Sequence, residues 1–328
     1  MKILTVSVAC YNVEKFIEEA LEPFTMQEIA DDIEVLVVND GSKDNTSKLA
    51  HRFEKEYPNT FKVIDKENGG YGSTINAGLL EATGKYFKLL DGDDWYNKEC
   101  LKKYVDTLKE SDEDLIITDG IWVEEETKKE TLHLAFDNYD GKRIFSFDEY
   151  PKNIGIHAYN TTIKTSLIKD IRITEHCFYT DTEYLIKGLS RCNSIAYYNI
   201  PIYMYRIGRD EQSMSFEGLK RHYKDAVRYY KEVLRFEKNN SMSDSFRNNY
   251  LNHALVSLAQ YHLSTFFLLS PKLKKEYIEF DKHIKKEDSI TYKESGTGRI
   301  NLLRKTKYFG YKVVCWWSKK KFNNRKIV

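Results

Sequence analysis

Short apolar runs alternate with amphipathic segments along the first 120 residues of the chain. Apolar side chains recur at helical spacing near residues 16–24, 49–53 and 101–108, which is typical of helices that bury one face. The runs between them are rich in β-branched and aromatic residues, and they predict buried strands at 3–9, 33–39, 61–64, 86–90 and 115–118. Strands that alternate with helices predict an α/β fold, with a mostly parallel sheet and helices on both faces.

The pattern changes twice beyond this region. From about residue 121 to 206 the alternation becomes irregular, and past residue 216 it turns helical. Strand-like pieces lie at 156–163 and 195–205, and helical segments at 219–237 and 245–269. The last stretch, 296–328, contains no acidic residue. We therefore expect boundaries near residues 215 and 295.

Polar or glycine-containing loops follow four of the predicted strands. They are Cys10-Tyr11-Asn12, the segment from Asn39 to Thr46, Asn68-Gly69-Gly70-Tyr71-Gly72, and Asp91-Gly92-Asp93-Asp94. In an open parallel sheet the carboxyl ends of the strands meet at one edge, and ligands bind there. Each loop taken alone also fits a tight turn or a helix cap. Their order along one edge favours a ligand site, because structure alone requires no such coincidence.

Asp91 and Asp93 are candidate ligands of a hard divalent cation, because Mg²⁺ and Mn²⁺ prefer carboxylate, phosphate and water oxygens. A second Asp-x-Asp, at Asp112 and Asp114, precedes a predicted strand, and we interpret it as a solvated loop. Asp40, at the end of a neighbouring strand, has a carboxylate that can accept hydrogen bonds from the edge of a base. The chain lacks Gly-x-Gly-x-x-Gly and Gly-x-x-x-x-Gly-Lys-Ser/Thr, so neither a dinucleotide-dependent dehydrogenase nor a P-loop kinase fits.

Four ordered motifs together resemble the family 2 glycosyltransferases of GT-A fold, of bacterial capsular or exopolysaccharide type. They are Val6 to Asn12, Val37 to Ser42 with Asp44-Asn45-Thr46, Asn68-Gly69-Gly70 with Asn76-Ala77-Gly78, and Leu90 to Asp94. The resemblance covers roughly the first 215 residues. It implies a Rossmann-like fold of nucleotide-diphospho-sugar transferases. It also implies an inverting enzyme that moves a sugar from a UDP-sugar to a glycan or lipid-linked acceptor in surface polysaccharide synthesis.

The resemblance further implies a division of the chain into three parts. Residues 1–215 would form the catalytic domain, in which 1–120 bind the nucleotide and 121–215 bind the acceptor. Residues 216–295 would form a helical region, and 296–328 a basic, aromatic-rich tail.

Within the catalytic domain the resemblance implies roles for individual residues. Asp40 matches the position that reads the uracil ring, with Tyr11 and the Ala9 backbone beside the base. Asp91 matches the ribose or diphosphate contact, and Asp93, with help from Asp91, matches the ligand of Mn²⁺ or Mg²⁺. Further donor-binding candidates come from the motifs and from a stretch that would close over the diphosphate: Asn12, Gly70, Asn76, Gly92, Arg206, Arg209 and Ser213. The two arginines fit surface charges on a loop equally well.

The candidate general base is Asp181. The family often has Glu-Asp before a helix, and here Thr180 stands where the family has Glu. Glu183 is the competing candidate. We favour Asp181, because at the start of a helix over 182–189 it would face the cleft, while Glu183 lies one residue further round. Alternatively, Asp181 caps that helix and has no catalytic role.

Composition is consistent with such an enzyme. The chain has 328 residues and a net charge of +1, which gives no global field for nucleic acid. Five scattered cysteines without a Cys-x-x-Cys pair indicate neither a zinc site nor a disulfide framework, and His157 and His222 have no spaced partner. The first residues are typical of a strand and not of a signal peptide, and no apolar run is long enough to span a bilayer. We therefore expect a cytoplasmic protein.

The basic tail adds a possible membrane contact. Between residues 296 and 328 ten cations are interleaved with aromatic and aliphatic residues, including Trp316 and Trp317. Such a segment suits an anionic membrane surface, at about 1 kcal/mol per nearby cation. The alternative is a C-terminal helix that packs its apolar residues on the catalytic domain and leaves a solvated basic face. The membrane interpretation predicts a peripheral location on the inner face of the cell membrane.

Two other functional classes remain open. A nucleotidyltransferase acting on sugar phosphates also combines an α/β sheet with a carboxylate-bound metal, but the chain lacks a Gly-rich, Lys/Arg-bearing triphosphate loop near its N-terminus. A non-catalytic carbohydrate-binding scaffold would not need Asp40, Asp91, Asp93 and Asp181 together. The product separates the three classes, because they release UDP, pyrophosphate or nothing.

Overall fold

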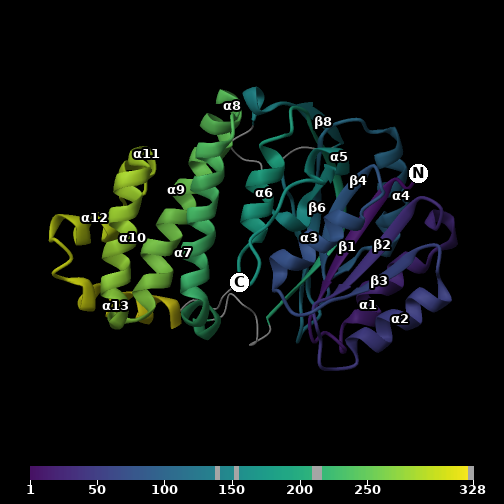
Figure 1. Ribbon diagram of the computed structural model, residues 1–328, viewed down its shortest axis with the longest axis horizontal. Coiled ribbons are helices and arrows are strands. Elements are labelled where there is room, and N and C mark those ends of the chain that lie inside the picture. Colours follow the sequence, from purple (N-terminus) through teal and green to yellow (C-terminus); the bar gives the residue numbers. More distant parts are fainter. Residues whose placement is uncertain (137–140, 151–154, 209–215, 324–328) are drawn as a thin grey trace. The chain divides into compact units, whose positions relative to one another are not determined.

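The protein divides into two compact units, unit 1 (Met1–Ile207) and unit 2 (Gly208–Val328) (Figure 1). The structure, a computed structural model, describes residues 1–136, 141–150, 155–208 and 216–323. Unit 1 is built on one sheet flanked by helices, and unit 2 is helical. The α/β fold with a helical C-terminal region, as predicted from the sequence, is confirmed.

The strands of unit 1 form one ten-stranded sheet in the order β3-β2-β1-β4-β9-β6-β10-β5, with β7 paired to β6 and β8 paired to β10. They are β1 (Leu4–Cys10), β2 (Ile33–Asn39), β3 (Phe61–Asp65), β4 (Tyr86–Asp91), β5 (Trp95–Tyr96), β6 (Leu115–Glu124), β7 (Glu130–His133), β8 (Lys142–Phe145), β9 (Thr161–Lys164) and β10 (Ile195–Ile207). The strands β3, β2, β1 and β4 are parallel, as expected. The other half is mixed, because β9 lies between β4 and β6 and is antiparallel to both.

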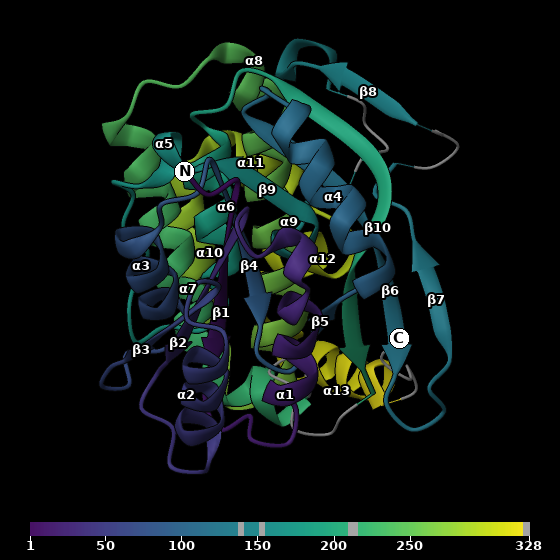
Figure 2. The same ribbon diagram turned by 90° about the vertical axis from the view of Figure 1, so that its right-hand side faces the viewer.

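Helices cover both faces of this sheet (Figure 2). They are α1 (Ile17–Leu21), α2 (Thr46–Glu56), α3 (Tyr71–Glu81), α4 (Lys98–Glu110), α5 (Thr165–Ile168) and α6 (Asp181–Leu189), with 3-10 turns η1 (Glu22–Thr25), η2 (Gln27–Ile29), η3 (Phe147–Glu149) and η4 (Ala158–Asn160). Consecutive strand residues point to opposite faces, as Tyr86 and Phe87 do. Tyr86 belongs to the core shared with α1, α2 and α4, whereas Phe87 packs against Tyr184 of α6. Gly78 of α3 also approaches the Phe87 ring.

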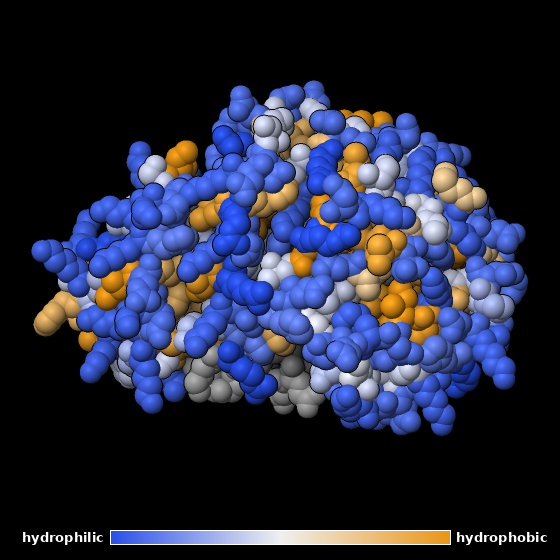
Figure 3. Space-filling model, in the orientation of Figure 1, coloured by the Kyte–Doolittle hydropathy of each residue, from blue (hydrophilic) through white to orange (hydrophobic). Residues whose placement is uncertain are grey.

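The central strands are buried on both faces. In β1 every residue except Ala9 is buried, so the strand has no solvated side that would require alternating polar residues. The outer surface is different. Figure 3 shows a face covered largely by hydrophilic side chains, with hydrophobic ones in smaller separate areas.

Unit 2 consists of helices and helical turns. They are α7 (Phe216–Asn239), α8 (Asp244–Phe246), η5 (Arg247–Leu251), α9 (Asn252–Tyr261), η6 (His262–Phe266), η7 (Phe267–Leu269), η8 (Pro271–Leu273), α10 (Lys274–Glu287), α11 (Ser289–Glu294), α12 (Gly298–Lys305) and α13 (Tyr311–Asn323). The π-helical turns η5 and η6 interrupt the segment expected to be helical over 245–269. Burial lowers the pKa of His262 to about 4, against the effect of the Leu258 and Ala226 carbonyls that face its two ring nitrogens. The neutral imidazole donates its single N–H to one of these carbonyls.

The C-terminal segment contributes to the core of unit 2. Leu303 and Tyr311 are fully buried, and Arg304 pairs with the buried Asp281 of α10 at 2.7 Å. The same segment leaves a set of apolar side chains exposed: Leu302, Phe309, Val313, Trp316 and Trp317. One side of the segment therefore packs within unit 2 and another faces outward, and contact with a membrane stays a prediction. Across the described residues, the helices are all too short or too polar to cross a membrane.

Candidate active site

The loops after β1 and β2 are bonded to each other. Asn12 has a positive φ of 54°, a conformation that asparagine tolerates better than most residues. Its backbone N–H donates to the Ser42 hydroxyl at 3.0 Å, and its side-chain carbonyl accepts from the Lys43 N–H at 2.8 Å. Tyr11, just before it, is 50% exposed. Asn12 thus holds the two loops together and leaves Tyr11 open to a ligand.

Asp40 organises the glycine loop after β3. Its carboxylate is buried and accepts hydrogen bonds from the backbone N–H groups of Gly69 and Gly70, both at 2.8 Å. Lys66 Nζ lies 2.7 Å away and Ser73 Oγ donates at 3.2 Å. The side chain that the sequence assigns to base recognition is thus bonded to the protein on both oxygens. Contact between Asp40 and a uracil ring stays a prediction.

An open depression of about 550 Å³ lies beside this loop. It is lined by Gly41, Lys43, Asp65, Lys66, Glu67 and Asn68. The lining is strongly polar, and it directly borders the Asp40 carboxylate through Lys66. The depression is therefore large enough for part of a small ligand and offers charged and amide groups to it.

The loop after β4 folds back against β1. The Gly92 N–H donates to the Ala9 carbonyl at 2.9 Å. A side chain at this position would bring a Cβ within 2.8 Å of the same carbonyl oxygen and 3.1 Å of the Cys10 sulfur. Glycine is therefore required by the close approach, and the Ala9 and Gly92 backbones, both donor-binding candidates, contact each other.

Asp94, the last acid of this loop, is buried and structural. Its carboxylate accepts the Tyr203 hydroxyl at 2.9 Å and the Arg206 N–H at 2.8 Å. The Tyr203 oxygen in turn accepts the Asp91 N–H at 3.2 Å. Burial and the nearby charge of Asp91 raise the pKa of Asp94 well above its usual value, against the effect of these bonds. Asp94 therefore connects the end of β4 to β10.

Arg206 of β10 clamps the same loop. Its guanidinium is only 3% exposed, and its Nε donates to the Asp93 carbonyl at 2.8 Å. The other guanidinium nitrogens pair with Glu19 and Glu125. Its carbon lies 4.8 Å and 4.6 Å from the ring centroids of two flanking aromatic residues, Phe16 and Trp95. Arg206 was expected to meet a diphosphate, but its donors serve the protein, and we assign it a positioning role.

Tyr71 connects the acids of two distant segments. It is the first residue of α3, and its phenol hydrogen-bonds to Asp91. Burial, and then the charges of Asp91 and Asp181, raise the pKa of this phenol well above its usual value. Tyr205 of β10 has its pKa raised by burial and by the charges of Asp94, Asp91 and Asp181. The structure therefore brings Asp91 and Asp181 together around two tyrosines that the sequence reasoning missed.

Asp181 begins α6, with its carboxylate half-buried. Burial raises its pKa above the ordinary 3.8, while the backbone N–H groups of Thr182 and of Asp181 itself lower it. A carboxylate with a raised pKa is a better proton acceptor than an exposed aspartate. The position and electrostatics of Asp181 are thus compatible with a general base.

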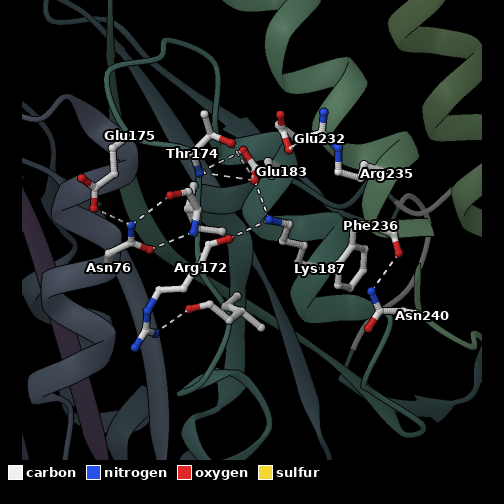
Figure 4. A network of polar contacts seen from close by, with 12 residues as sticks. Asn76, Arg172, Thr174, Glu175, Glu183, Lys187, Glu232, Arg235, Phe236 and Asn240 are labelled. Carbon is white, nitrogen blue, oxygen red and sulfur yellow. Dashed lines mark hydrogen bonds and ion pairs between the residues drawn. The ribbon is translucent and has the colours of Figure 1, made fainter. Parts of the chain in front are cut away.

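Glu183 has a different environment from Asp181. It is fully buried, pairs with Lys187 at 2.6 Å and accepts the N–H and hydroxyl of Thr174 (Figure 4). Lys187 also donates to the Arg172 carbonyl at 2.6 Å. Glu183 therefore anchors the segment that leads to Asp181, and we retain Asp181 as the candidate base.

The same segment is fastened to α3. Asn76 donates to the Ile173 carbonyl and to Glu175, and its side-chain oxygen accepts the Ile173 N–H at 2.8 Å (Figure 4). A Cβ on Gly72 would lie 2.2 Å from the Thr174 carbonyl oxygen. Asn76, expected to bind the donor, thus tethers the loop that carries the base. The other two residues of the expected closing stretch, Arg209 and Ser213, lie outside the described residues.

Asp91 and Asp93 are chemically suited to a divalent cation. They supply hard carboxylate oxygens, while the Asp94 carboxylate is already bonded to Tyr203 and Arg206. In the part of the chain that the structure describes, His, Cys, Asp and Glu side chains do not gather in groups of three or more that could hold a metal. A cation here would therefore need diphosphate and water oxygens to complete its shell, as Mg²⁺ commonly does.

Known proteins share both the sequence and the fold. A family model described as "Glycosyl transferase family 2" matches residues 5–172, just over half of the chain. The minor teichoic acid biosynthesis protein GgaB of Bacillus subtilis (strain 168) is 28% identical over 213 residues, 64% of this chain and 23% of GgaB. The putative glycosyltransferase EpsH of the same strain is 26% identical over 257 residues, 73% of this chain and 70% of EpsH. The chain therefore spans about a quarter of the length of GgaB.

The solved structures show a shared fold. S. aureus TarS 1–349, in complex with UDP-GlcNAc, aligns with a TM-score of 0.69 over 98% of this chain and 90% of that one. The two sequences are 20% identical. At this identity the likeness extends to the fold of the chain.

Removing the partner of Glu183 should weaken the segment before Asp181. Lys187→Met leaves a buried carboxylate without its ion-pair partner, and we expect a loss of about 3 kcal/mol in the free energy of unfolding, measured in urea. Glu183→Gln combined with Lys187→Met should cost less than the sum of the two single changes. Lys55→Met, at an exposed position of α2, is the control and should change stability by less than about 0.5 kcal/mol. If the losses in the free energy of unfolding are strictly additive, Glu183 and Lys187 do not stabilise each other, which would contradict the ion pair.

Proposed function

Because the chain belongs to glycosyl transferase family 2, we propose that it transfers a sugar from a UDP-sugar to a hydroxyl of a glycan or lipid-linked saccharide. The transfer would invert the anomeric carbon, with Asp181 as general base and a divalent metal at the departing diphosphate. We place it in the synthesis of a surface polysaccharide, which is consistent with the name of the teichoic acid relative.

One observation carries this proposal: two carboxylates about ninety residues apart in sequence act on the same tyrosines. Asp91 follows β4, and Asp181 begins α6. Both charges raise the pKa of Tyr71 and of Tyr205. Transfer needs a group that stabilises the departing diphosphate and another that accepts the acceptor proton. These two carboxylates are suited to these separate roles.

The donor half of the proposal rests on the loops around Asp40. The polar depression beside Lys43 and Lys66 would accept the uridine part of the donor, with Tyr11 exposed nearby. S. aureus TarS, which shares the fold, has been solved with UDP-GlcNAc. We therefore assign a UDP-sugar as the donor class.

The chemical step is a single displacement at the anomeric carbon. Asp181 takes the proton of the acceptor hydroxyl as its oxygen forms the new glycosidic bond, and the bond to UDP breaks on the opposite side. The raised pKa of Asp181 favours this proton transfer. Arg206 holds the Asp93 carbonyl and thereby keeps the acidic loop in shape for the donor.

Asp91 and Asp93 would hold the divalent ion, Mn²⁺ or Mg²⁺. When bound, such an ion neutralises negative charge on the departing diphosphate. The clamp formed by Arg206 and Asp94 restricts the loop in which both ligands lie, so the carboxylates need little rearrangement to bind it.

The first test is the product. With Mn²⁺ present, a screen of UDP-sugars should identify one from which the protein releases UDP, and Asp93→Ala should abolish that release and weaken UDP binding measured by calorimetry. Glu110→Ala, at an exposed position of α4, is the control for a lost surface carboxylate and should retain the metal dependence. Full activity in excess chelator contradicts the metal site. Release of pyrophosphate from a nucleoside triphosphate would instead support a nucleotidyltransferase.

The second test separates the base from donor binding. Asp181→Asn should slow transfer by roughly a hundredfold or more while UDP affinity stays nearly unchanged. The general base must be deprotonated to accept a proton. Because the pKa of Asp181 is raised above 3.8, the activity of the parent chain should fall as the pH drops through that raised pKa. An inactive Glu183→Gln variant that remains folded, beside an active Asp181→Asn variant, would show that Glu183 is the base.

We also propose that the exposed side of α12 and α13 contacts an anionic membrane at the inner face of the cell membrane. Trp316 and Trp317 are 62% and 49% exposed, and Lys320 lies 5.7 Å from the Trp316 ring centroid. Other described cations of this segment are exposed too: Lys305, Lys307, Lys312 and Lys319. A lipid-linked acceptor would place its enzyme at such a surface.

Point substitutions test this contact better than truncation, because the tail also carries the buried Leu303 and Tyr311. Trp316→Ser with Trp317→Ser should reduce co-sedimentation with phosphatidylglycerol vesicles by roughly tenfold, and salt should weaken the binding of the parent chain. Ile290→Ser removes an equally exposed apolar residue of α11 and should leave sedimentation unchanged. Equal sedimentation of the tryptophan variant and the parent chain, or no sedimentation at low salt, would contradict the membrane contact.

A further inference from the structure

A row of five aromatic rings lies at the ends of β6, β7 and β10. Trp122 stacks on His133 with 3.7 Å between ring centroids and 16° between planes, and it lies 5.8 Å from Tyr205. Tyr159 is 5.8 Å from Tyr205, and His157 stacks on Tyr159 at 5.4 Å and 3°. We call these five residues the aromatic platform. It uses none of the side chains assigned to catalysis or donor binding.

The backbone of the sheet builds this row. Trp122 of β6 and Tyr205 of β10 are direct partners in the parallel register, so their side chains leave the same face. Two positions before Trp122, a Cβ on Gly120 would lie 3.1 Å from the Tyr159 ring. Glycine inside a strand commonly marks such a close approach. Gly120 therefore lets the Tyr159 ring rest directly on β6.

The platform is reachable from solvent. Trp122, His133, Tyr159 and Tyr205 are half-buried, and His157 is exposed. Large aromatic residues with one side packed and the other accessible are common in ligand sites, where they provide flat apolar area.

The platform borders the candidate catalytic carboxylates. Burial first, and then the charges of Asp94, Asp91 and Asp181, raise the pKa of Tyr205. Tyr159 also lies 5.5 Å from the ring of Tyr203, whose hydroxyl accepts the Asp91 N–H, so a ligand lying on the platform would have one edge near the acidic loop. This places the platform on the side of the site where a proton-donating acceptor is needed.

The charge of the platform favours a neutral ligand. Desolvation of the ring lowers the pKa of His133 and of His157, although His157 keeps an exposed side, and nearby His133 lowers the pKa of His157 further. Lowered pKa values favour neutral imidazoles, and the charges that act on Tyr205 come from carboxylates. A phosphate would be repelled here, whereas a neutral ring would not.

We propose that the aromatic platform binds a pyranose ring of the acceptor, with the flat C–H face of the sugar on the rings and the attacking hydroxyl toward Asp181. Aromatic faces carry negative charge density that attracts the polarised C–H groups of a sugar ring. The inference rests on the proposed function, because it names the acceptor class of that same site. It makes Trp122 and Tyr159 binding residues for the acceptor.

The test uses the full chain without donor or metal and two saccharide probes, methyl β-D-glucopyranoside and N,N′-diacetylchitobiose. Binding is measured by saturation-transfer NMR titration. Trp122→Ala should raise the dissociation constant roughly three- to tenfold, and Trp122→Phe, which keeps a ring, should raise it less. Leu132→Ala is the matched control, because Leu132 precedes His133 on β7, points to the other face and is 55% exposed. It should bind like the parent chain.

Two outcomes would overturn the proposal. One is that Trp122→Ala and Trp122→Phe bind both saccharides as tightly as the parent chain does, or that Leu132→Ala loses as much saccharide affinity as the Trp122 variants. The other is preferential binding of glycerol 3-phosphate, which has no ring and would indicate a polyol phosphate acceptor. Thermal unfolding of each variant identifies a loss of saccharide binding that is caused by misfolding. If Trp122→Ala does not fold, Trp122→Phe is compared with the parent chain instead. Saccharide binding needs no donor, so a failure to release UDP would count against the proposed function and not against the platform.

Discussion

The site of unit 1 depends on one buried charge, the guanidinium of Arg206. An isolated cation in a protein interior costs several kcal/mol, and partners must offset that cost. Here the partners come from α1 and from the loops after β4 and β6: Glu19, the Asp93 carbonyl and Glu125. Because these partners together offset the cost of the buried charge, Arg206 links the acidic loop to α1 and to the end of β6.

A second constraint holds the segment before α6 against α3. Gly72 allows the Thr174 carbonyl to approach the helix, and Asn76 bonds to Ile173 on the same side. Glu183 then fastens Thr174 from the opposite direction. The backbone that leads to Asp181 is thus fixed at both ends of a short stretch. This is the rigidity that a proton acceptor needs, since misplacement by about 1 Å can cost a hundredfold in rate.

The sequence predicted the central strands well, because β1 and β2 are buried on both faces and consist mostly of β-branched and other apolar residues. It also predicted the order of the loops, since local motifs encode it, whereas metal binding by Asp91 stays a prediction. It did not indicate that Arg206 and Asn76 bond to the protein, because their partners are distant in sequence. A motif shows which side chains are charged or polar. Whether such a side chain bonds to a ligand or to the protein depends on tertiary contacts.

Tyrosines were missed for a related physical reason. In the sequence, Tyr71 lies within the glycine loop and Tyr205 within a strand pattern, and nothing there marks either as a neighbour of the acids. In the structure, burial and the charges of Asp91 and Asp181 raise the pKa of both phenols, and burial and the charge of Asp91 raise the pKa of Asp94. Neutral hydroxyls can donate hydrogen bonds without adding charge, so acids can lie closer together than their mutual repulsion would otherwise allow. The concentration of acids that marks this site in the sequence is therefore sustained by residues that no acidic motif reveals.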